Sequence, residues 1–199
     1  MIDFYNIKSF GDIAEFHNIM PLVNIPSVLQ NGILSNKKAE KIIHKSIAMN
    51  EIQKRRSKVQ VPNGLYLHEY SNLYLHARNP MLYVRNSEEI CILRIGKSIC
   101  DLQKIVFADR NASSDYVVFL SKDQVNLLDY KLIFAQNWTD DNQFEYFEKK
   151  SKKCAELLIP DKIDSKYILG AYVINEKVKE KLQKLGFVKM ITVNKEIFF

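Results

Sequence analysis

The sequence predicts an α+β fold in which a strand-rich core is flanked by a few helices. After the turn Pro62-Asn63-Gly64, about eight runs of β-type residues follow one another. Helical patterns with start and stop signals lie before and between these runs. The 199 residues are 47% hydrophobic and 26% charged, the balance of a folded globular chain. We therefore expect one domain over residues 1–199, with a sizeable core.

The N-terminal part predicts one strand and two helices. Residues 12–20 form an apolar run that is interrupted by His17, which indicates a buried strand. Residues 24–32 follow as a helix, with Pro26 near the first turn and Gly32 at the end. Residues 36–58 have helical spacing and contain no Pro or Gly. The basic cluster 54–58 ends this helix, and its simplest interpretation is a solvated helix terminus.

The remaining sequence predicts the strands of the core. Helical patterning returns at residues 122–130, 142–152 and 176–185, and Gly186 ends the last of these. The β-type runs are LYLHEYSNLYL, MLYVRN, ICILRI, KIVFA, YVVFL, CAELLI, ILGAYVI and KMITVNKEIFF.

The net charge and the cysteine content indicate which binding partners and which cellular compartment to expect. Lys and Arg number 29 against 23 Asp and Glu, a net charge of +6 that mildly favours anionic partners such as nucleic acid. Cys91, Cys100 and Cys154 are odd in number and lack C-x-x-C spacing, so neither disulfides nor a thiolate zinc site are indicated. The N-terminus lacks signal-peptide character, and no run approaches about 20 apolar residues. We expect a soluble cytoplasmic protein with no membrane partner.

Common catalytic motifs are missing. The sequence has no G-x-x-x-x-G-K-[ST] and no G-x-G-x-x-G after a strand, which disfavours P-loop enzymes, kinases and classical dehydrogenases. The four histidines have no H-E-x-x-H spacing, so we expect no metal. Polar residues in apolar or turn contexts remain, namely His17, Arg78 and Glu156. Each also has a purely structural interpretation. His17 can be a core histidine with its hydrogen bonds satisfied, Arg78 can pair with a structural carboxylate, and Glu156 can belong to a buried ion pair.

An ordered set of segments between residues 13 and 174 resembles one family, the DarT-type DNA ADP-ribosyltransferases, which are the toxins of DarTG toxin–antitoxin pairs. The first segment contains a His strand, an Asn-x-Pro-Ser-Val-Leu helix and a Gly-Ile-Leu-Ser ending. The last has the Ala-Glu pair of the strand that carries the family's catalytic glutamate. The matching segments are FHNIMPLVNIPSVLQNGILS, EIQKRRSKVQVP, HEYSNLYLHARNPMLY, VFADRNA and KKCAELLIPDKI. The resemblance implies a single ADP-ribosyltransferase-like domain with two packed sheets and flanking helices.

The sequence departs from the family pattern at four residues. Asn18 and Met20 stand where Thr and His often follow the first histidine, and Cys154 replaces a polar residue before Ala-Glu. Asn111 occupies a position that is His in some members. Asn18, Met20 and Asn111 lie in substrate-facing regions, so these departures concern base preference more than the reaction.

The resemblance assigns the chemistry to Glu156 and to an arginine. Transfer of ADP-ribose from NAD breaks the nicotinamide–ribose bond through a cation-like transition state, which a carboxylate stabilises. The same carboxylate can act as general base toward a protonated base nitrogen, and Glu156 is expected in both roles. Arg55 or Arg56 is expected to hold the diphosphate, with Arg55 favoured. His17 would bond a ribose hydroxyl. The residues expected at the NAD site are His17, Asn18, Ile19, Asn24, Arg55, Arg56 and Tyr74.

A second set of residues is expected to meet the nucleic acid. Arg78 with Asn79 would support either substrate, and Tyr74 and Tyr83 would line the nicotinamide or stack on a base, although plain packing explains strand tyrosines equally well. The lysines before Glu156 would lie on a loop that meets the substrate, or simply form a solvated helix surface. The residues expected to bind nucleic acid are Arg78, Asn79, Tyr83, Arg110, Asn111, Lys149, Lys150 and Lys153.

The expected function is NAD-dependent modification of a base in single-stranded DNA, with thymine favoured over guanine. The resemblance also implies a monomeric toxin and an antitoxin with ADP-ribosyl-glycohydrolase (macrodomain) activity. One alternative is transfer onto RNA or protein through the same NAD site. Others are a non-catalytic nucleic-acid-binding regulator that uses residues 36–58, and a metal-free ribonuclease toxin.

Overall fold

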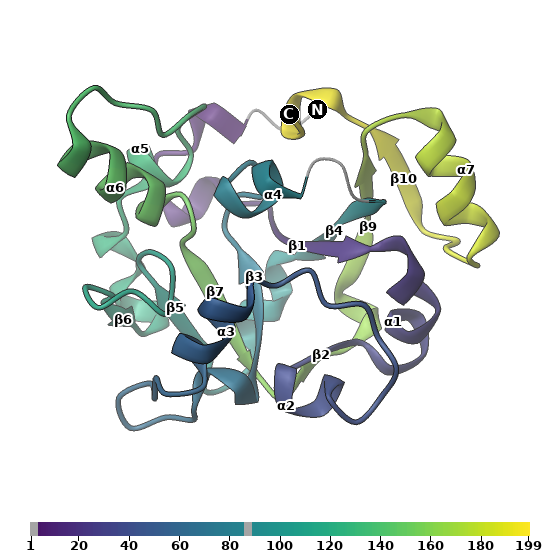
Figure 1. Cartoon of the computed structure of the whole chain (residues 1–199), viewed down its shortest axis with the longest axis horizontal. Coiled ribbons are helices and arrows are strands. Elements are labelled where there is room, and N and C mark those ends of the chain that lie inside the picture. The colour runs from purple at the N-terminus through teal and green to yellow at the C-terminus, as the bar shows by residue number, and fades with distance from the viewer. Residues whose placement is uncertain (1–3, 86–88) are drawn as a thin grey trace.

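The computed structural model describes residues 4–85 and 89–199 and confirms the α+β fold class. An eight-stranded sheet has the order β10-β9-β4-β1-β3-β7-β5-β6, and β2 and β8 form a separate two-stranded sheet (Figure 1). The strands are β1 (Glu15–Pro21), β2 (Ile33–Leu34), β3 (Tyr70–Tyr74), β4 (Ile90–Gly96), β5 (Val106–Ala108), β6 (Phe119–Leu120), β7 (Glu156–Pro160), β8 (Lys162–Ile163), β9 (Ile168–Val173) and β10 (Met190–Val193).

The large sheet is divided between β1 and β3. β1 pairs with β4 along seven registered positions, from Glu15–Gly96 to Pro21–Ile90. The described ladder between β1 and β3 contains only the pair His17–Tyr74. The sequence predicted two packed sheets, whereas the structure has two four-stranded halves joined at this one pair. On the side of β3, the described backbone of β1 beyond His17 is therefore not paired with a strand, while its other edge stays paired with β4.

The helices are short and surround the sheet (Figure 1). The predicted helices at 24–32, 142–152 and 176–185 are confirmed as α1, α6 and α7, whereas residues 122–127 form a 3-10 helix. Gly186, with φ 86°, follows α7 in the left-handed conformation that ends helices. The helices are α1 (Ile25–Asn31), α2 (Asn36–Ala39), α3 (Asn50–Arg56), α4 (Pro80–Val84), α5 (Tyr130–Ile133), α6 (Gln143–Lys152) and α7 (Glu176–Lys184).

Two predicted elements are wrong. The continuous helix over 36–58 is interrupted between α2 and α3, because the Asn24 side chain bonds the backbone N–H and C=O of Lys45, each at 2.8 Å. The predicted strand MLYVRN is helix α4. Asn79 caps this helix by accepting bonds from the amides of Met81 and Leu82, and Pro80 occupies its first turn.

The core lies on both faces of the sheet, and it fixes the strands that carry the site. Fully buried side chains include Phe16, Leu73, Ile92, Leu93 and Phe107. Burial of such side chains stabilises a fold by about 1.5–3 kcal/mol each. In the described part of the chain, no helix is long and apolar enough to cross a membrane.

Candidate active site

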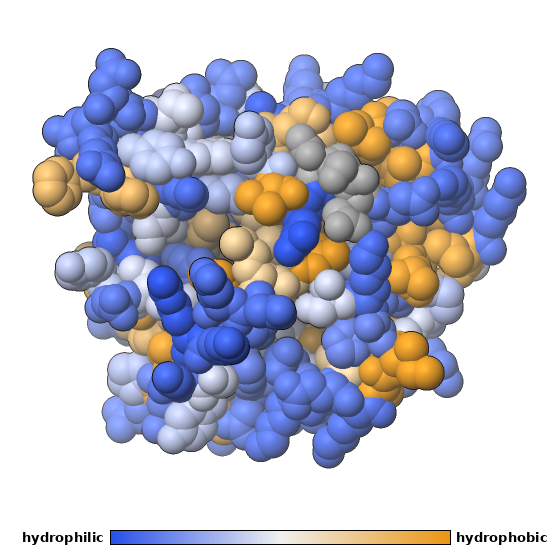
Figure 2. Space-filling view, viewed as in Figure 1, coloured by the Kyte–Doolittle hydropathy of each residue, from blue (hydrophilic) through white to orange (hydrophobic). Residues whose placement is uncertain are grey.

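A pocket of about 690 Å³ lies where the sheet divides. β1, β3, α1, α3, α4, α6, the start of β7 and the loops 40–49 and 109–118 all contribute to its lining. Figure 2 shows apolar surface at the centre of this face, surrounded by hydrophilic side chains. Such a mixture of apolar walls and few polar groups is typical of a small-molecule site.

Glu156 lies at the pocket wall as the first residue of β7. Its neighbours in register are Tyr74 of β3 and Ala108 of β5, so the sheet fixes its backbone on both sides. The residue is 1% exposed, and its carboxylate accepts two bonds of 3.0 Å from Nη1 of Arg56. The amide of Ala112 donates a third bond of 3.1 Å. A buried carboxylate needs such partners, and these bonds also fix its orientation.

Arg56, rather than Arg55, is the arginine that contacts Glu156. Arg56 ends α3 and is 7% exposed, while Arg55 is exposed on the pocket lining. Successive residues of a helix point about 100° apart, because one turn contains about 3.6 residues. Arg56 therefore reaches the sheet, and Arg55 faces an outer part of the pocket.

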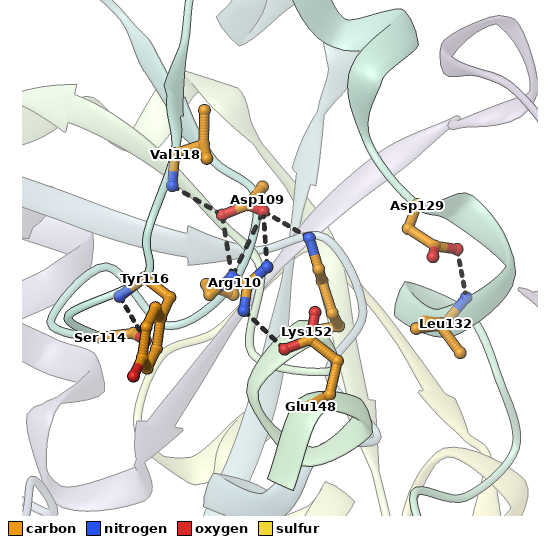
Figure 3. A network of polar contacts seen from close by, with 9 residues as sticks. All are labelled: Asp109, Arg110, Ser114, Tyr116, Val118, Asp129, Leu132, Glu148 and Lys152. Atoms are coloured by element: carbon orange, nitrogen blue, oxygen red, sulfur yellow. Dashed lines mark hydrogen bonds and ion pairs between the residues drawn. The ribbon is translucent and has the colours of Figure 1, made fainter. Parts of the chain in front are cut away.

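A polar network holds the loop that donates the Ala112 amide (Figure 3). Asp109 accepts bonds from the Val118 amide (2.9 Å), from Lys152 and from Arg110. Arg110 also donates to Glu148 of α6 at 2.7 Å. Burial would raise the pKa of Asp109, but the bonds from Lys152, Val118 and Arg110 outweigh it and hold the pKa below its ordinary value. The network thus ties both ends of the loop 109–118 to α6.

Asn18 brings an unsatisfied polar atom to the pocket. Its Nδ2 donates to the carbonyl of Asn72 at 3.1 Å, and Asn72 lines the pocket as well. Its Oδ1 is buried and has no partner among the described residues. Buried polar atoms usually have partners, so a ligand donor in this position would be stabilised.

Cys154 also lines the pocket, next to the catalytic candidate. Burial, together with the nearby Glu156, raises the pKa of its thiol to about 12. The thiol is therefore neutral near pH 7 and is a poor nucleophile. In the described ranges, no group of three or more His, Cys, Asp or Glu side chains is arranged to hold a metal ion.

A family model described as "ssDNA thymidine ADP-ribosyltransferase, DarT" matches residues 17–199. This chain belongs to the DarT family. A DNA ADP-ribosyl transferase of Thermus aquaticus is 27% identical over 85% of this chain and 79% of its own length. A fusion of a DNA ADP-ribosyl transferase with a DNA ADP-ribosyl glycohydrolase from Thermosipho africanus is 28% identical over 88% of this chain, which spans 46% of that protein.

Solved DarT structures have the same fold. Thermus sp. 2.9 DarT in complex with ADP-ribosylated ssDNA superposes with a TM-score of 0.84, covering 96% of this chain and 99% of that chain at 23% identity. Thermosipho africanus DarTG in complex with ADP-ribose gives 0.81 at 26% identity, covering 94% of this chain and 51% of that chain. The ADP-ribosyltransferase-like architecture expected from the sequence is therefore confirmed.

In this DarT-family chain, the pocket brings together most of the residues expected to bind NAD. They are Asn18, Ile19, Asn24, Arg55, Arg56 and Tyr74. His17 is the exception, because successive strand residues point to opposite faces. Its imidazole is fully buried beside Glu15 (3.3 Å) and Phe4, and His17 is not among the residues that line the pocket. Asn18 is therefore the β1 residue next to His17 whose side chain lines the pocket, and a contact of His17 with a ribose stays a prediction.

Only two of the residues expected to bind nucleic acid line the pocket, Asn111 and Lys150. The others are engaged elsewhere in the structure. Arg78 donates to the carbonyls of Glu196 and Phe198, and the Tyr83 ring packs on Trp138 and Phe199. Asn79 caps α4, Arg110 and Lys149 form ion pairs, and Lys153 is buried against His76.

Sequence reasoning missed two aromatic residues of the pocket lining, Tyr116 and Phe147. For Phe147 a signal existed. Phe147, Lys150, Ser151 and Cys154 recur at the three- and four-residue spacing of one helix face, and this face leads to Glu156. Tyr116 lies in the polar loop 109–118, which has no periodicity, and gave no signal.

Proposed function

We propose that this chain transfers ADP-ribose from NAD⁺ to thymine in single-stranded DNA and releases nicotinamide. One observation carries the proposal: the buried Glu156 carboxylate, fixed by Arg56 and the Ala112 amide, faces a pocket of about 690 Å³ in the divided sheet. The match of residues 17–199 to the DarT family model supports the assignment of substrate and reaction.

The pocket has donors and acceptors that suit NAD⁺. Its size is within the range of cofactor sites, about 300–1,000 Å³. The permanently charged fork of Arg55 suits a diphosphate, and the unpaired Oδ1 of Asn18 suits an amide or hydroxyl donor. A solved DarT from Thermus sp. 2.9 is in complex with NAD⁺, which supports this choice of ligand.

Glu156 would act in both halves of the reaction. Loss of nicotinamide leaves positive charge on the ribose, and a fixed carboxylate beside the ribose lowers the energy of that state. A ring nitrogen of thymine carries a proton at neutral pH, and the same carboxylate can accept it as the new N–C bond forms. Arg56 and the Ala112 amide hold the carboxylate in place during both steps.

Single-stranded DNA fits a buried carboxylate better than duplex DNA does. In a duplex the base edge is paired, and its extraction costs a few kcal/mol before any chemistry. The complex of Thermus sp. 2.9 DarT with ADP-ribosylated ssDNA supports the same acceptor. We expect single strands to be the better substrates at every salt concentration.

The biological setting is part of the same proposal. The Thermosipho relative joins a transferase to a DNA ADP-ribosyl glycohydrolase, and this supports an antitoxin that removes the modification. We infer a toxin that works as a monomeric domain on DNA in the cytoplasm. The free cysteines Cys91, Cys100 and Cys154 favour a reducing compartment.

Mass spectrometry of oligonucleotides tests the proposal. Single strands containing one thymine, one guanine or neither are incubated with the protein and NAD⁺, and each is compared with its duplex. We expect one ADP-ribose unit on the thymine-containing single strand and far less on its duplex. A modification on guanine would correct the base, and equal rates on both forms or no DNA product would contradict the proposal.

A further inference from the structure

The part of the pocket nearest α6 differs from the part nearest α1. Figure 1 shows α6 and the loop between β5 and β6 on one side of α3, and α1, α2 and β2 on the other. On the α1 side the lining includes the buried side chains of Val28, Ile33 and Ile47. On the α6 side it includes two exposed aromatic rings, Tyr116 (79% exposed) and Phe147 (55% exposed).

The two rings stand on two elements that also position Glu156. Phe147 belongs to the face of α6 that continues through Lys150, Ser151 and Cys154 toward β7. Tyr116 belongs to the loop whose Ala112 amide bonds the Glu156 carboxylate. Figure 3 shows Tyr116 on this loop, with the Asp109–Lys152 and Arg110–Glu148 contacts joining the loop to α6. The loop 109–118 and α6, which bear the two rings, are thus held together by contacts within the chain itself.

The charge of the pocket lining as a whole suits a polyanion, and Lys150 brings one of its cations to the α6 side. The pocket lining carries Lys45, Arg55, Arg56 and Lys150 against two acids, Asp115 and Glu156, and the Arg56 charge is paired with Glu156. Exposed aromatic rings beside cations are the usual platform for single-stranded nucleic acid, since bases stack on the rings and phosphates meet the cations.

We propose that Tyr116 and Phe147 stack on the bases that neighbour the modified nucleotide and so hold the single strand at the pocket. This inference rests on the proposed function, and it names the substrate contacts of the same site. The rings fix the strand without reading its sequence, because every base has a face on which a ring can stack.

Abasic substitution tests the proposal directly. The substrate is a single-stranded oligonucleotide with one thymine, and its neighbours are either normal bases or abasic sugars. For the wild-type protein we expect the abasic neighbours to lower kcat/KM about tenfold, as loss of one stacked base would. Phe147→Ala, Phe147→Leu and Tyr116→Ala should each lose a similar factor with normal neighbours and become less sensitive to the abasic substitution than the wild type, because only one ring still stacks.

Phe144→Ala is the matched control. Phe144 lies on the same helix and is 87% exposed, but it does not belong to the pocket lining. This variant should retain the wild-type response. If the Phe147 and Tyr116 variants remain as sensitive to abasic neighbours as the wild type, the stacking proposal is overturned.

A binding measurement separates this proposal from the proposed function. Fluorescence anisotropy of a labelled single-stranded oligonucleotide requires no reaction. Weaker binding by Phe147→Ala than by Phe144→Ala would support the stacking contacts even if no ADP-ribose were transferred. Equal binding by the two variants, or no binding by the wild type, would contradict them.

Discussion

Residue type alone does not decide which of the two adjacent arginines, Arg55 or Arg56, contacts Glu156. Both were candidates from the sequence, with Arg55 favoured, and only the helix geometry separates them. Arg56 shares two bonds with the Glu156 carboxylate, while Arg55 is exposed at the pocket. The context of Glu156, between Ala155 and Leu157 in an apolar strand, fits a buried ion-pair member and a catalytic group equally well, and its pairing with Arg56 is observed. Its catalytic role follows from the resemblance to the DarT family and stays a prediction.

We predict opposite consequences for the two arginine variants. Arg56→Ala leaves the buried carboxylate with only the Ala112 amide, so the free energy of unfolding should fall by about 1–3 kcal/mol and transfer should be lost. Arg55→Ala should change the free energy of unfolding by less than about 0.5 kcal/mol and raise KM for NAD⁺. Urea unfolding and initial rates measure both effects, and equal losses of stability would contradict the assignment.

Among the elements, the loop 40–49 is held by a residue from another segment of the chain, Asn24. Asn24 follows β1. Its side-chain amide accepts a hydrogen bond from the Lys45 N–H and donates one to the Lys45 C=O, as the backbone of a neighbouring strand would. The sequence of 36–58 predicts a continuous helix, because the breaking interaction comes from Asn24, far along the chain. The strand predicted at MLYVRN failed for a local reason, since the Asn79 cap and Pro80 outweigh β-propensity.

Removal of the two hydrogen bonds between the Asn24 side chain and the Lys45 backbone should make the loop 40–49 of the pocket more mobile without unfolding the protein. Asn24→Ala is expected to raise KM for NAD⁺ about tenfold with a smaller change in kcat, because two hydrogen bonds that hold the loop are lost. Asn31→Ala, which removes a bond to Ser27 within α1, is the control and should leave KM unchanged. Steady-state kinetics with varied NAD⁺ decide between the two outcomes.

The polar network around Asp109 gives a second prediction, which concerns the position of the loop 109–118. Asp109→Asn weakens the contacts with Lys152 and Arg110 that tie the loop 109–118 to α6, so the Ala112 amide should shift relative to Glu156. Because small displacements in an active site reduce rates strongly, kcat should fall about 10- to 100-fold. Asp101→Asn, an exposed partner of Lys122, should have no effect, and a similar kcat for both variants would argue against a positioning role.

At the scale of the whole molecule, we expect a buried polar cluster between the ends of α5 and α6 to make stability depend on pH. Lys153 is fully buried and donates to Ala135 O at 2.6 Å and to Ile133 O at 3.0 Å, and His76 Nδ1 lies 3.0 Å from its amine. Burial lowers the pKa of Lys153 to about 7 and holds the pKa of His76 well below its ordinary value. A lysine beside a polar run gave no such signal in the sequence, since its burial follows from the tertiary fold.

The sign of this pH effect is fixed by the lowered pKa of Lys153. Above pH 7 the unfolded chain retains a proton, up to its ordinary pKa of 10.5, that the native protein has lost. The free energy of unfolding should therefore rise from pH 7 toward pH 9, by up to about 1.4 kcal/mol per pH unit. At higher pH the buried thiols, whose ordinary pKa is 9.0, oppose the trend.

Lys153→Met should flatten the rise between pH 7 and pH 9, whatever its effect on absolute stability, while Lys131→Met, which changes an exposed lysine, should preserve it. Urea unfolding at several pH values gives the slopes. Identical slopes for Lys153→Met and the wild type would show that the amine titrates normally in the native protein.

The expectation that Glu156 is the catalytic carboxylate is tested most directly by the rate of ADP-ribose transfer to a single-stranded thymine oligonucleotide. The wild type is compared with Glu156→Gln, which keeps the side-chain shape but removes the charge, and with Glu180→Gln, which changes an exposed glutamate on α7. We predict that Glu156→Gln retains less than about one hundredth of the wild-type rate and still binds NAD⁺, while Glu180→Gln is fully active. A Glu156→Gln rate within about tenfold of the wild type would contradict the assignment of this carboxylate.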